Sequence, residues 1–300
     1  MLIHIAIGDA YGAGFEFAPR AKIDAHNDGA GYVVHELGIP AGHYTDDTQM
    51  SIAIAELLLR DAPPDAPACA QAFVRAYQRD PRGGYSRGFG QLLSEVADGA
   101  ELLRRIHPGS VRNGAAMRSV PLSLIDDVVT LRRVAREQAS VTHDSPEGRA
   151  SSEVVGLMSH ALLRRTTRVD ALAAMVAAQT GFQLRDDWQG EVAVDAIETL
   201  HAVHTALVAT RSMGDLLRSC VAFGGDTDSV AAIALGLASL SHEFVDDLPA
   251  SLHAGLENAA YGRDWLDALD ARLVARYPLL GGVRAGRLPA QVATPSHGKP

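Results

Sequence analysis

The chain has 300 residues, of which 47% are hydrophobic and only 5% aromatic, and its formal net charge is −9. This length allows one large domain or two small ones, and the scarcity of aromatic side chains favours packed helices over a β-sandwich. The negative charge argues against nonspecific binding to nucleic-acid phosphates, although it is compatible with a local pocket for a small anion.

The two cysteines, Cys69 and Cys220, lie far apart and form no CxxC pattern. They predict neither a disulfide framework nor a thiolate zinc site, and they suit a reducing compartment. The first residues lack the basic segment of a signal peptide, and no apolar run is long enough to span a membrane. The sequence therefore predicts a cytoplasmic protein with no membrane partner.

The first segment, IAIGDAYGAGFEF, is crowded with glycine and alanine. Because glycine weakens a helix, this composition predicts either a close approach of two backbones or a strained turn. Glu16 follows between Phe15 and Phe17, and in isolation such a carboxylate is more typical of a surface than of an active site.

Helical periodicity continues along the chain. Apolar residues from Met50 to Leu58 fall on one helical face, and the proline-rich segment 61–67 ends that helix. The pattern then predicts a helix over 68–79 and a loop over 79–88. Further helices are predicted over 89–106, 121–140, 146–165, 169–180, 190–209, 213–222 and 227–242, with one or two more within 249–276. Residues 281–300 lack periodicity. We predict one all-α domain over 1–280, a single compact orthogonal helical bundle, followed by a flexible tail over 281–300.

The segment YTDDTQ places Asp46 and Asp47 where a helix begins, directly after Thr45. The simplest interpretation is helix capping, since Thr45 is a favourable N-cap and acidic side chains stabilise the first turn. A second turn, GGDTDS, places Asp226 and Asp228 at the start of another apolar helix. Capping requires one acceptor per helix, so the second aspartate of each pair suggests another role.

Metal binding is the alternative role. Adjacent helical side chains point about 100° apart, so paired aspartates at a helix start suit two neighbouring ions better than one. Carboxylate and hydroxyl oxygens select Mg²⁺, Mn²⁺ or Ca²⁺. If the two turns meet without metal, their carboxylates repel one another and the pKa values rise. We therefore predict a metal cleft formed at helix N-termini, with two ions about 3.5–4 Å apart that orient a substrate and activate a water.

Five motifs occur in order: GDAYGAGFEF, YTDDTQMSIAIAELLL, NGAAMRSVPL, VTHDSP and GGDTDSVAAIALGLA. Together they resemble the ADP-ribosylglycohydrolase family over roughly residues 3–275. The resemblance implies an all-α enzyme with two divalent cations, Mg²⁺ or Mn²⁺. Such an enzyme releases ADP-ribose from a modified protein, nucleic acid or small molecule by cleaving the bond at the anomeric carbon of the distal ribose.

The resemblance also implies a role for each matching residue. The implied catalytic residues are Glu16, Asp47 and Asp228, and the implied metal ligands are Thr45, Asp46, Asp47, Asp226, Asp228 and Ser229. The implied substrate-binding residues, of which the first lie in a loop that holds the diphosphate, are Gly109, Ser110, Asn113, Gly114, Met117, Arg118 and His143. Without the resemblance, the Asn-Gly pair would be interpreted as an ordinary turn, and His143 as a capping or core residue.

The chain departs from the family pattern at three positions. Ser229 replaces a usual threonine but keeps the hydroxyl, Arg112 replaces a frequent glycine in the diphosphate loop, and Tyr11 replaces the leucine of GDALG. The first departure preserves ligation, the second changes the shape of the loop, and the third predicts altered packing near the cleft.

The sequence also allows alternatives to this function. The His143-Asp144 pair suggests an HD-type phosphohydrolase, another all-α binuclear metal hydrolase, but no further histidines in ligand register can be placed. The segment DDTQM lacks the last aspartate of the isoprenoid synthase motif. A non-catalytic ADP-ribose-binding protein is the strongest alternative. Trp188 and Trp265 are interpreted as core residues. The cleaved linkage, the metal in use and the oligomeric state are left open.

Overall fold

Helices form the regular structure of residues 1–61 and 64–285, which the computed structural model describes. Within these residues, β structure is limited to isolated bridges such as Val192 with Gly225. The helices are, in chain order, α1 Leu2–Ala13, α2 Arg20–His26, α3 Asp46–Leu58, α4 Ala66–Arg79, α5 Arg87–Glu95, α6 Gly99–Arg105, α7 Gly114–Met117, the 3₁₀ turn η1 Val120–Leu124, α8 Val128–Ser140, α9 Pro146–Leu163, η2 Val169–Ala171, α10 Leu172–Thr180, α11 Ala196–Ala209, α12 Met213–Phe223, α13 Thr227–Leu240, α14 Ala250–Gly255, α15 Arg263–Arg276 and α16 Leu279–Ala285. The predicted all-α class is confirmed.

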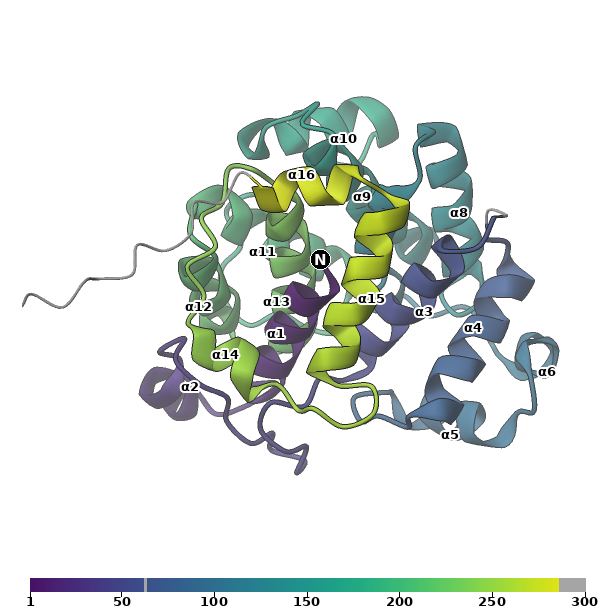
Figure 1. The fold of residues 1–300 in the computed structure, drawn as a ribbon, viewed down its shortest axis with the longest axis horizontal. Helices are drawn as coiled ribbons and strands as arrows, with labels where there is room; N and C mark the ends of the chain where they lie inside the picture. The colour runs from purple at the N-terminus through teal and green to yellow at the C-terminus, as the bar shows by residue number, and fades with distance from the viewer. Residues whose placement is uncertain (62–63, 286–300) are drawn as a thin grey trace, which may run out of the picture.

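The centre of the fold is the pair α1 and α13, around which the other helices are arranged (Figure 1). Glycines allow these two helices to touch. A Cβ atom at Gly8 would lie 2.4 Å from the Ala231 carbonyl oxygen, and one at Gly12 would lie 2.5 Å from the Asp228 Cα. The predicted close backbone approach is therefore confirmed within the helix over residues 2–13, and a turn with Phe17 at a φ of 46° follows it over residues 14–17.

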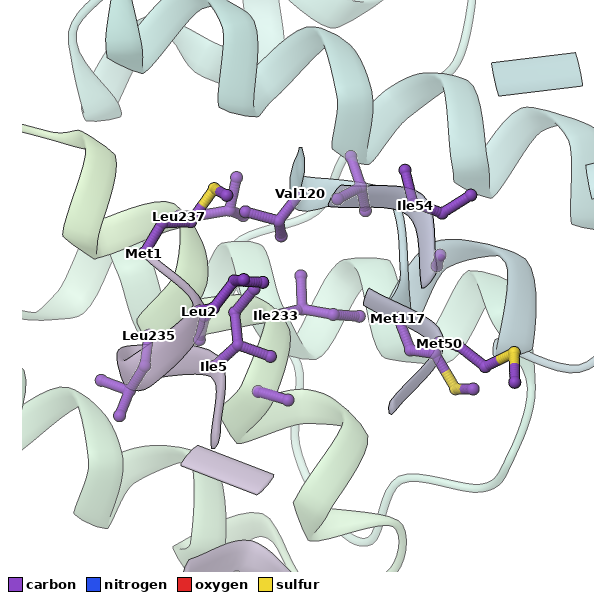
Figure 2. Packing of buried hydrophobic residues seen from close by; sticks show 14 of the residues in the cluster. Met1, Leu2, Ile5, Met50, Ile54, Met117, Val120, Ile233, Leu235 and Leu237 are labelled. Carbon is purple, nitrogen blue, oxygen red and sulfur yellow. The ribbon is translucent and has the colours of Figure 1, made fainter. Parts of the chain in front are cut away.

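Buried aliphatic side chains fill the space between the helices. Figure 2 shows Leu2 and Ile5 of α1 near Ile233 of α13, with Met50 and Ile54 of α3 in the same cluster. These side chains are almost completely buried. Because α1 and α3 are both fixed against this core, their ends are held in position relative to α13.

Aspartate N-caps interrupt two predicted helices in the structure and move the start of a third. Asp98, Asp127 and Asp195 each accept a backbone N–H of the following turn, at 2.7 to 2.8 Å. A capping residue lies outside the helix that it caps, so each of these aspartates marks a new start. The predicted helices 89–106, 121–140 and 190–209 are corrected to α5 with α6, η1 with α8, and α11.

The end of the described chain differs from the predicted tail. Residues 281–285 belong to α16, so helical structure continues past the predicted boundary at 280. Residues 286–300 of the predicted tail lie outside the described residues. None of the helices in the described ranges is long and apolar enough to cross a membrane.

Tyr11, which replaces the leucine of the family pattern, connects α1 to the segment after α2. Its ring is fully buried. The hydroxyl accepts a hydrogen bond from the Gly29 N–H (2.8 Å) and donates one to Asn27 Oδ1 (3.1 Å). The tyrosine therefore adds polar contacts that a leucine could not make.

We expect Tyr11→Phe to lower the free energy of unfolding by about 1–3 kcal/mol, because it leaves two partly or fully buried polar groups without a partner. Urea denaturation would measure this loss. Tyr32→Phe is the matched control, since the Tyr32 hydroxyl donates a single bond, to the Leu252 carbonyl (2.7 Å), and its removal should cost less. Equal stability of Tyr11→Phe and the parent chain would contradict the assignment.

Candidate metal centre and active site

The two acidic turns meet at one cavity. Both α3 and α13 begin at a cavity of about 540 Å³, although 179 positions separate Asp47 from Asp226 in the chain. The cavity is lined by the following residues of the predicted catalytic and metal-binding set: Glu16, Asp46, Asp47, Asp226, Asp228 and Ser229. The fold thus brings these predicted oxygen donors together, whereas the predicted ligand Thr45 does not line the cavity.

Asp9 of α1 caps the start of α3. Its carboxylate accepts hydrogen bonds from the N–H of Thr45 (2.9 Å) and of Thr48 (2.9 Å), and from both hydroxyls, at 2.8 and 2.6 Å. Neither Thr45 nor Asp226, the N-cap residues of α3 and α13, makes a side-chain capping bond. Side-chain capping therefore does not explain the paired aspartates, and Thr45 is held with its hydroxyl on Asp9.

Glycines shape the loops that approach the carboxylates. Gly225 has a φ of 77°, and a Cβ atom there would lie 2.1 Å from the Val192 carbonyl oxygen. Gly84, in the loop before α5, has a φ of 99°, and its Cβ atom would lie 2.1 Å from Asp46 Oδ1. Only glycine tolerates both the left-handed backbone and this proximity. These positions bring backbone directly against the acidic turns.

The strained backbone of the next residue, Phe17, holds Glu16 near the second acidic turn. Phe17 has a φ of 46°, which is uncommon for a bulky side chain, and its N–H donates to the Gly225 carbonyl at 2.8 Å. This bond holds the end of α1 against the start of α13. As a result, one carboxylate oxygen of each of Glu16, Asp226 and Asp228 lies within 4.8 Å of the others, an arrangement that could hold a metal ion.

The carboxylates repel one another in the absence of cations. Burial raises the pKa values of Asp46, Asp47 and Asp228 well above the ordinary range, and neighbouring carboxylates raise them further. Burial also raises the pKa of Asp226, while hydrogen bonds from neighbouring side chains, Asn113 and Ser229 among them, oppose the rise. The carboxylates of the two turns therefore have raised pKa values, as predicted.

A buried carboxylate oxygen without a partner makes the site suited to a hard cation. Asp47 Oδ1 is buried and has no hydrogen-bond partner among the described residues. An uncompensated buried carboxylate oxygen is costly unless a cation or proton occupies the adjacent space. The nearby acidic donors, Asp46, Asp226 and Asp228, are carboxylate oxygens, which suit hard divalent cations such as Mg²⁺, Mn²⁺ or Ca²⁺.

The predicted substrate-binding residues fall into two groups. Lining the cavity are Ser110, Asn113, Gly114, Met117, Arg118 and His143, whereas Gly109 does not line it and pairs with His143 in a β-bridge. The Asn113 side chain donates to Asp226 Oδ2 (2.7 Å) and to the Thr199 hydroxyl (3.0 Å). Its amide thus orients a carboxylate of the acidic cluster. Arg112 lines the cavity as well, with an exposed side chain.

Arg118 and His143 form a buried polar chain. Arg118 Nη2 donates to the Thr142 hydroxyl at 2.7 Å, and this hydroxyl lies 2.6 Å from His143 Nδ1. The Thr142 hydroxyl therefore links the guanidinium of Arg118 to the imidazole of His143. Burial and two nearby arginines lower the pKa of His143 to about 3, so the ring is neutral. Burial lowers the pKa of Arg118 to about 10, so the guanidinium stays charged.

The cavity extends beyond the predicted residues to α5 and α6. Phe89, Leu92 and Ile106 form an apolar part of its wall, with Arg105 nearby. This wall was not predicted, because these residues have ordinary helical spacing. Asp9 was not predicted either, and its only signal in the sequence is a charge inside an otherwise apolar helix. Trp188 and Trp265 pack against the core and do not line the cavity, as predicted.

These features define an all-α protein with an acidic cavity built at two helix N-termini. The profile of the ADP-ribosylglycohydrolase family matches residues 1–281, and the chain belongs to this family. A solved structure described as an ADP-ribosylglycohydrolase-related protein complex has the same fold, with a TM-score of 0.72 and 24% identity over 93% of this chain and 96% of that chain.

Curated relatives agree with the family assignment. The chain is 28% identical to ADP-ribosylarginine hydrolase Tri1 of Serratia proteamaculans, over 77% of this chain and 67% of the relative. It is 26% identical to ADP-ribosyl-[dinitrogen reductase] glycohydrolase of Rhodospirillum rubrum, over 90% and 88%. It is 25% identical to ADP-ribosylhydrolase ARH3 of Danio rerio, over 93% and 90%. The predicted enzyme class, a hydrolase of glycosidic bonds that removes ADP-ribose from modified substrates, is confirmed.

Proposed function

We propose that this enzyme uses two divalent cations, Mg²⁺ or Mn²⁺, to hydrolyse the bond at the anomeric carbon of the distal ribose. The observation that supports this proposal best is the convergence of both acidic turns on one cavity, where Asp47 Oδ1 is buried without a partner. The residues that would hold the cations are Thr45, Asp46, Asp47, Asp226, Asp228 and Ser229. When bound, the cations would supply fixed positive charge and lower the pKa of a water.

The side chains around the acidic cluster supply the remaining chemistry. Glu16 lies at the cavity wall and accepts the proton of the attacking water. Asn113 holds Asp226 in a fixed orientation through its amide. As the bond to the leaving group stretches, positive charge develops on the sugar, and the carboxylates of Asp47 and Asp228 stabilise it.

The substrate is anchored by its diphosphate. The charged Arg118 and the neutral imidazole of His143 line the same cavity and are suited to a phosphate and to a neutral hydrogen-bonding group, respectively. The backbone and hydroxyl of the loop from Ser110 to Asn113, which line the cavity at Ser110, Arg112 and Asn113, complete the diphosphate contacts. Binding of an anion therefore needs no basic surface elsewhere on this acidic chain.

The modified group is a protein side chain. Two of the relatives are named for the arginine linkage and for dinitrogen reductase. We therefore place an ADP-ribosylated protein side chain, with arginine as the first to be tested, ahead of a nucleic-acid base or a small ester.

A substrate panel tests the proposal. ADP-ribosylated arginine and serine peptides, ADP-ribosylated nucleic-acid ends and a small ADP-ribose ester are incubated with the enzyme in Mg²⁺, in Mn²⁺ and in chelator, and free ADP-ribose is quantified. We expect release from the arginine peptide only when a cation is present, and loss of release in Glu16→Gln. Tight binding of ADP-ribose by calorimetry without release from any substrate would instead identify a non-catalytic binding protein.

A further inference from the structure

A histidine that the sequence motifs do not include lies against Glu16. His35 belongs to the segment between α2 and α3, and only 5% of its surface is exposed. Its Nε2 atom lies 2.6 Å from Glu16 Oε2, and the exposures of the two side chains are 4% and 19%. The pair is therefore shielded from solvent on the histidine side and open on the glutamate side, where the cavity lies.

The proton of this contact can be placed from the backbone. The Leu37 N–H donates to His35 Nδ1 at 2.7 Å. A nitrogen that accepts a hydrogen bond carries no proton, so in this tautomer the proton is on Nε2, which donates to the Glu16 carboxylate. The direction of the hydrogen bond thus follows from the fold of the loop.

The loop that carries His35 is fixed on both sides. Lys22 of α2 donates from Nζ to the Val34 carbonyl and to Glu36 Oε1, both at 2.7 Å. The Gly38 N–H donates to the His35 carbonyl (2.9 Å), and Gly38 adopts a φ of 86° that closes the turn. Polar contacts therefore hold the imidazole in place, even though the next apolar side chain, Leu37, is 88% exposed.

We propose that His35 is a positioning residue for Glu16: its Nε2–H holds one carboxylate oxygen, so that the other is presented to the attacking water. This inference rests on the proposed function, in which Glu16 accepts the proton. In this role His35 does not contact the substrate. The strained Phe17 fixes the backbone of Glu16 and His35 fixes its side chain, so the two act on the same residue from opposite ends.

Matched amide variants test the role of His35. In His35→Gln the side-chain amide reaches the position of Nε2 and restores a donor, whereas in His35→Asn the amide is one methylene shorter and does not reach Glu16. We expect His35→Asn to lower kcat by about tenfold to hundredfold with little change in KM, as is typical for loss of a residue that orients a catalytic ligand. His35→Gln should retain most of the activity. Thermal unfolding of both variants checks the fold.

A double-mutant cycle separates positioning from structure. In a Glu16→Gln background, His35→Asn should cause no further loss of the residual activity, because its effect acts through the Glu16 carboxylate. An equal loss in both backgrounds, or equal damage by His35→Gln and His35→Asn, would overturn the inference but not the proposed function. If Glu16→Gln keeps only a small residual activity and both His35 variants are fully active, the inference alone is wrong. Absence of hydrolysis by the parent chain would reject both.

Discussion

Asp228→Ala is expected to abolish release of ADP-ribose while the helical fold is retained. Asp228 lies in the cluster with Glu16 and Asp226, and it is buried among like charges. Its removal takes away a cation ligand and a carboxylate that stabilises developing positive charge. We expect kcat/KM to fall by at least about a thousandfold, which corresponds to ~4 kcal/mol of transition-state stabilisation.

The measurement is initial-rate kinetics at saturating cation, with circular dichroism as the check of the fold. Asp247→Ala is a matched control, because Asp247 bonds to Ser212 and to the Gly214 N–H, and it does not line the cavity. This control should keep the parent activity at some cost in stability. Full activity of Asp228→Ala in the presence of metal would contradict the assignment of the active site.

Divalent cations are expected to stabilise the folded chain strongly at neutral pH, whether or not substrate is present. The buried carboxylates repel one another, and a cation that binds only the folded state relieves this repulsion. At a concentration of about one hundred times Kd, binding adds about 2.7 kcal/mol. For a chain of 300 residues, whose unfolding entropy is about 0.6 kcal/mol/K, the melting temperature should rise by roughly 4–5 °C.

The sign of the pH dependence follows from the raised pKa values. The unfolded carboxyl groups titrate near their ordinary range, whereas in the metal-free fold Asp46, Asp47 and Asp228 hold their protons to higher pH. The folded state then binds more protons than the unfolded state, so this contribution to stability is present at low pH and is lost as the pH rises through the folded pKa values. The stabilisation by Mn²⁺ should therefore be larger near about pH 8 than near about pH 5.

Scanning calorimetry with Mn²⁺, Mg²⁺ and chelator at both pH values measures this effect. Asp47→Asn should reduce the effect of cations and at the same time raise the stability of the metal-free chain, because it removes one of the repelling charges. A melting temperature that does not respond to Mn²⁺ or Mg²⁺ at either pH would contradict the proposed metal centre without any reference to activity.

Local sequence determined much of this protein. The spacing of apolar residues predicted most of the helices, because a buried helical face requires the 3.6-residue period. The composition of the first segment predicted the close approach that Gly8 and Gly12 permit. The paired aspartates of the two turns marked the acidic cluster, since one helix start needs only one capping acceptor.

The tertiary structure decided which partner each polar group would have. Nothing local indicates that Asp9 caps another helix, that Asn113 bonds to Asp226, or that His35 bonds to Glu16, because each pair is joined only when distant segments pack together. The interruptions of the predicted helices also depend on tertiary structure. An aspartate within a helical pattern of apolar residues caps a new helix only if the chain bends there. Periodicity depends on neighbours along the chain, whereas hydrogen bonding in a buried site depends on neighbours in space.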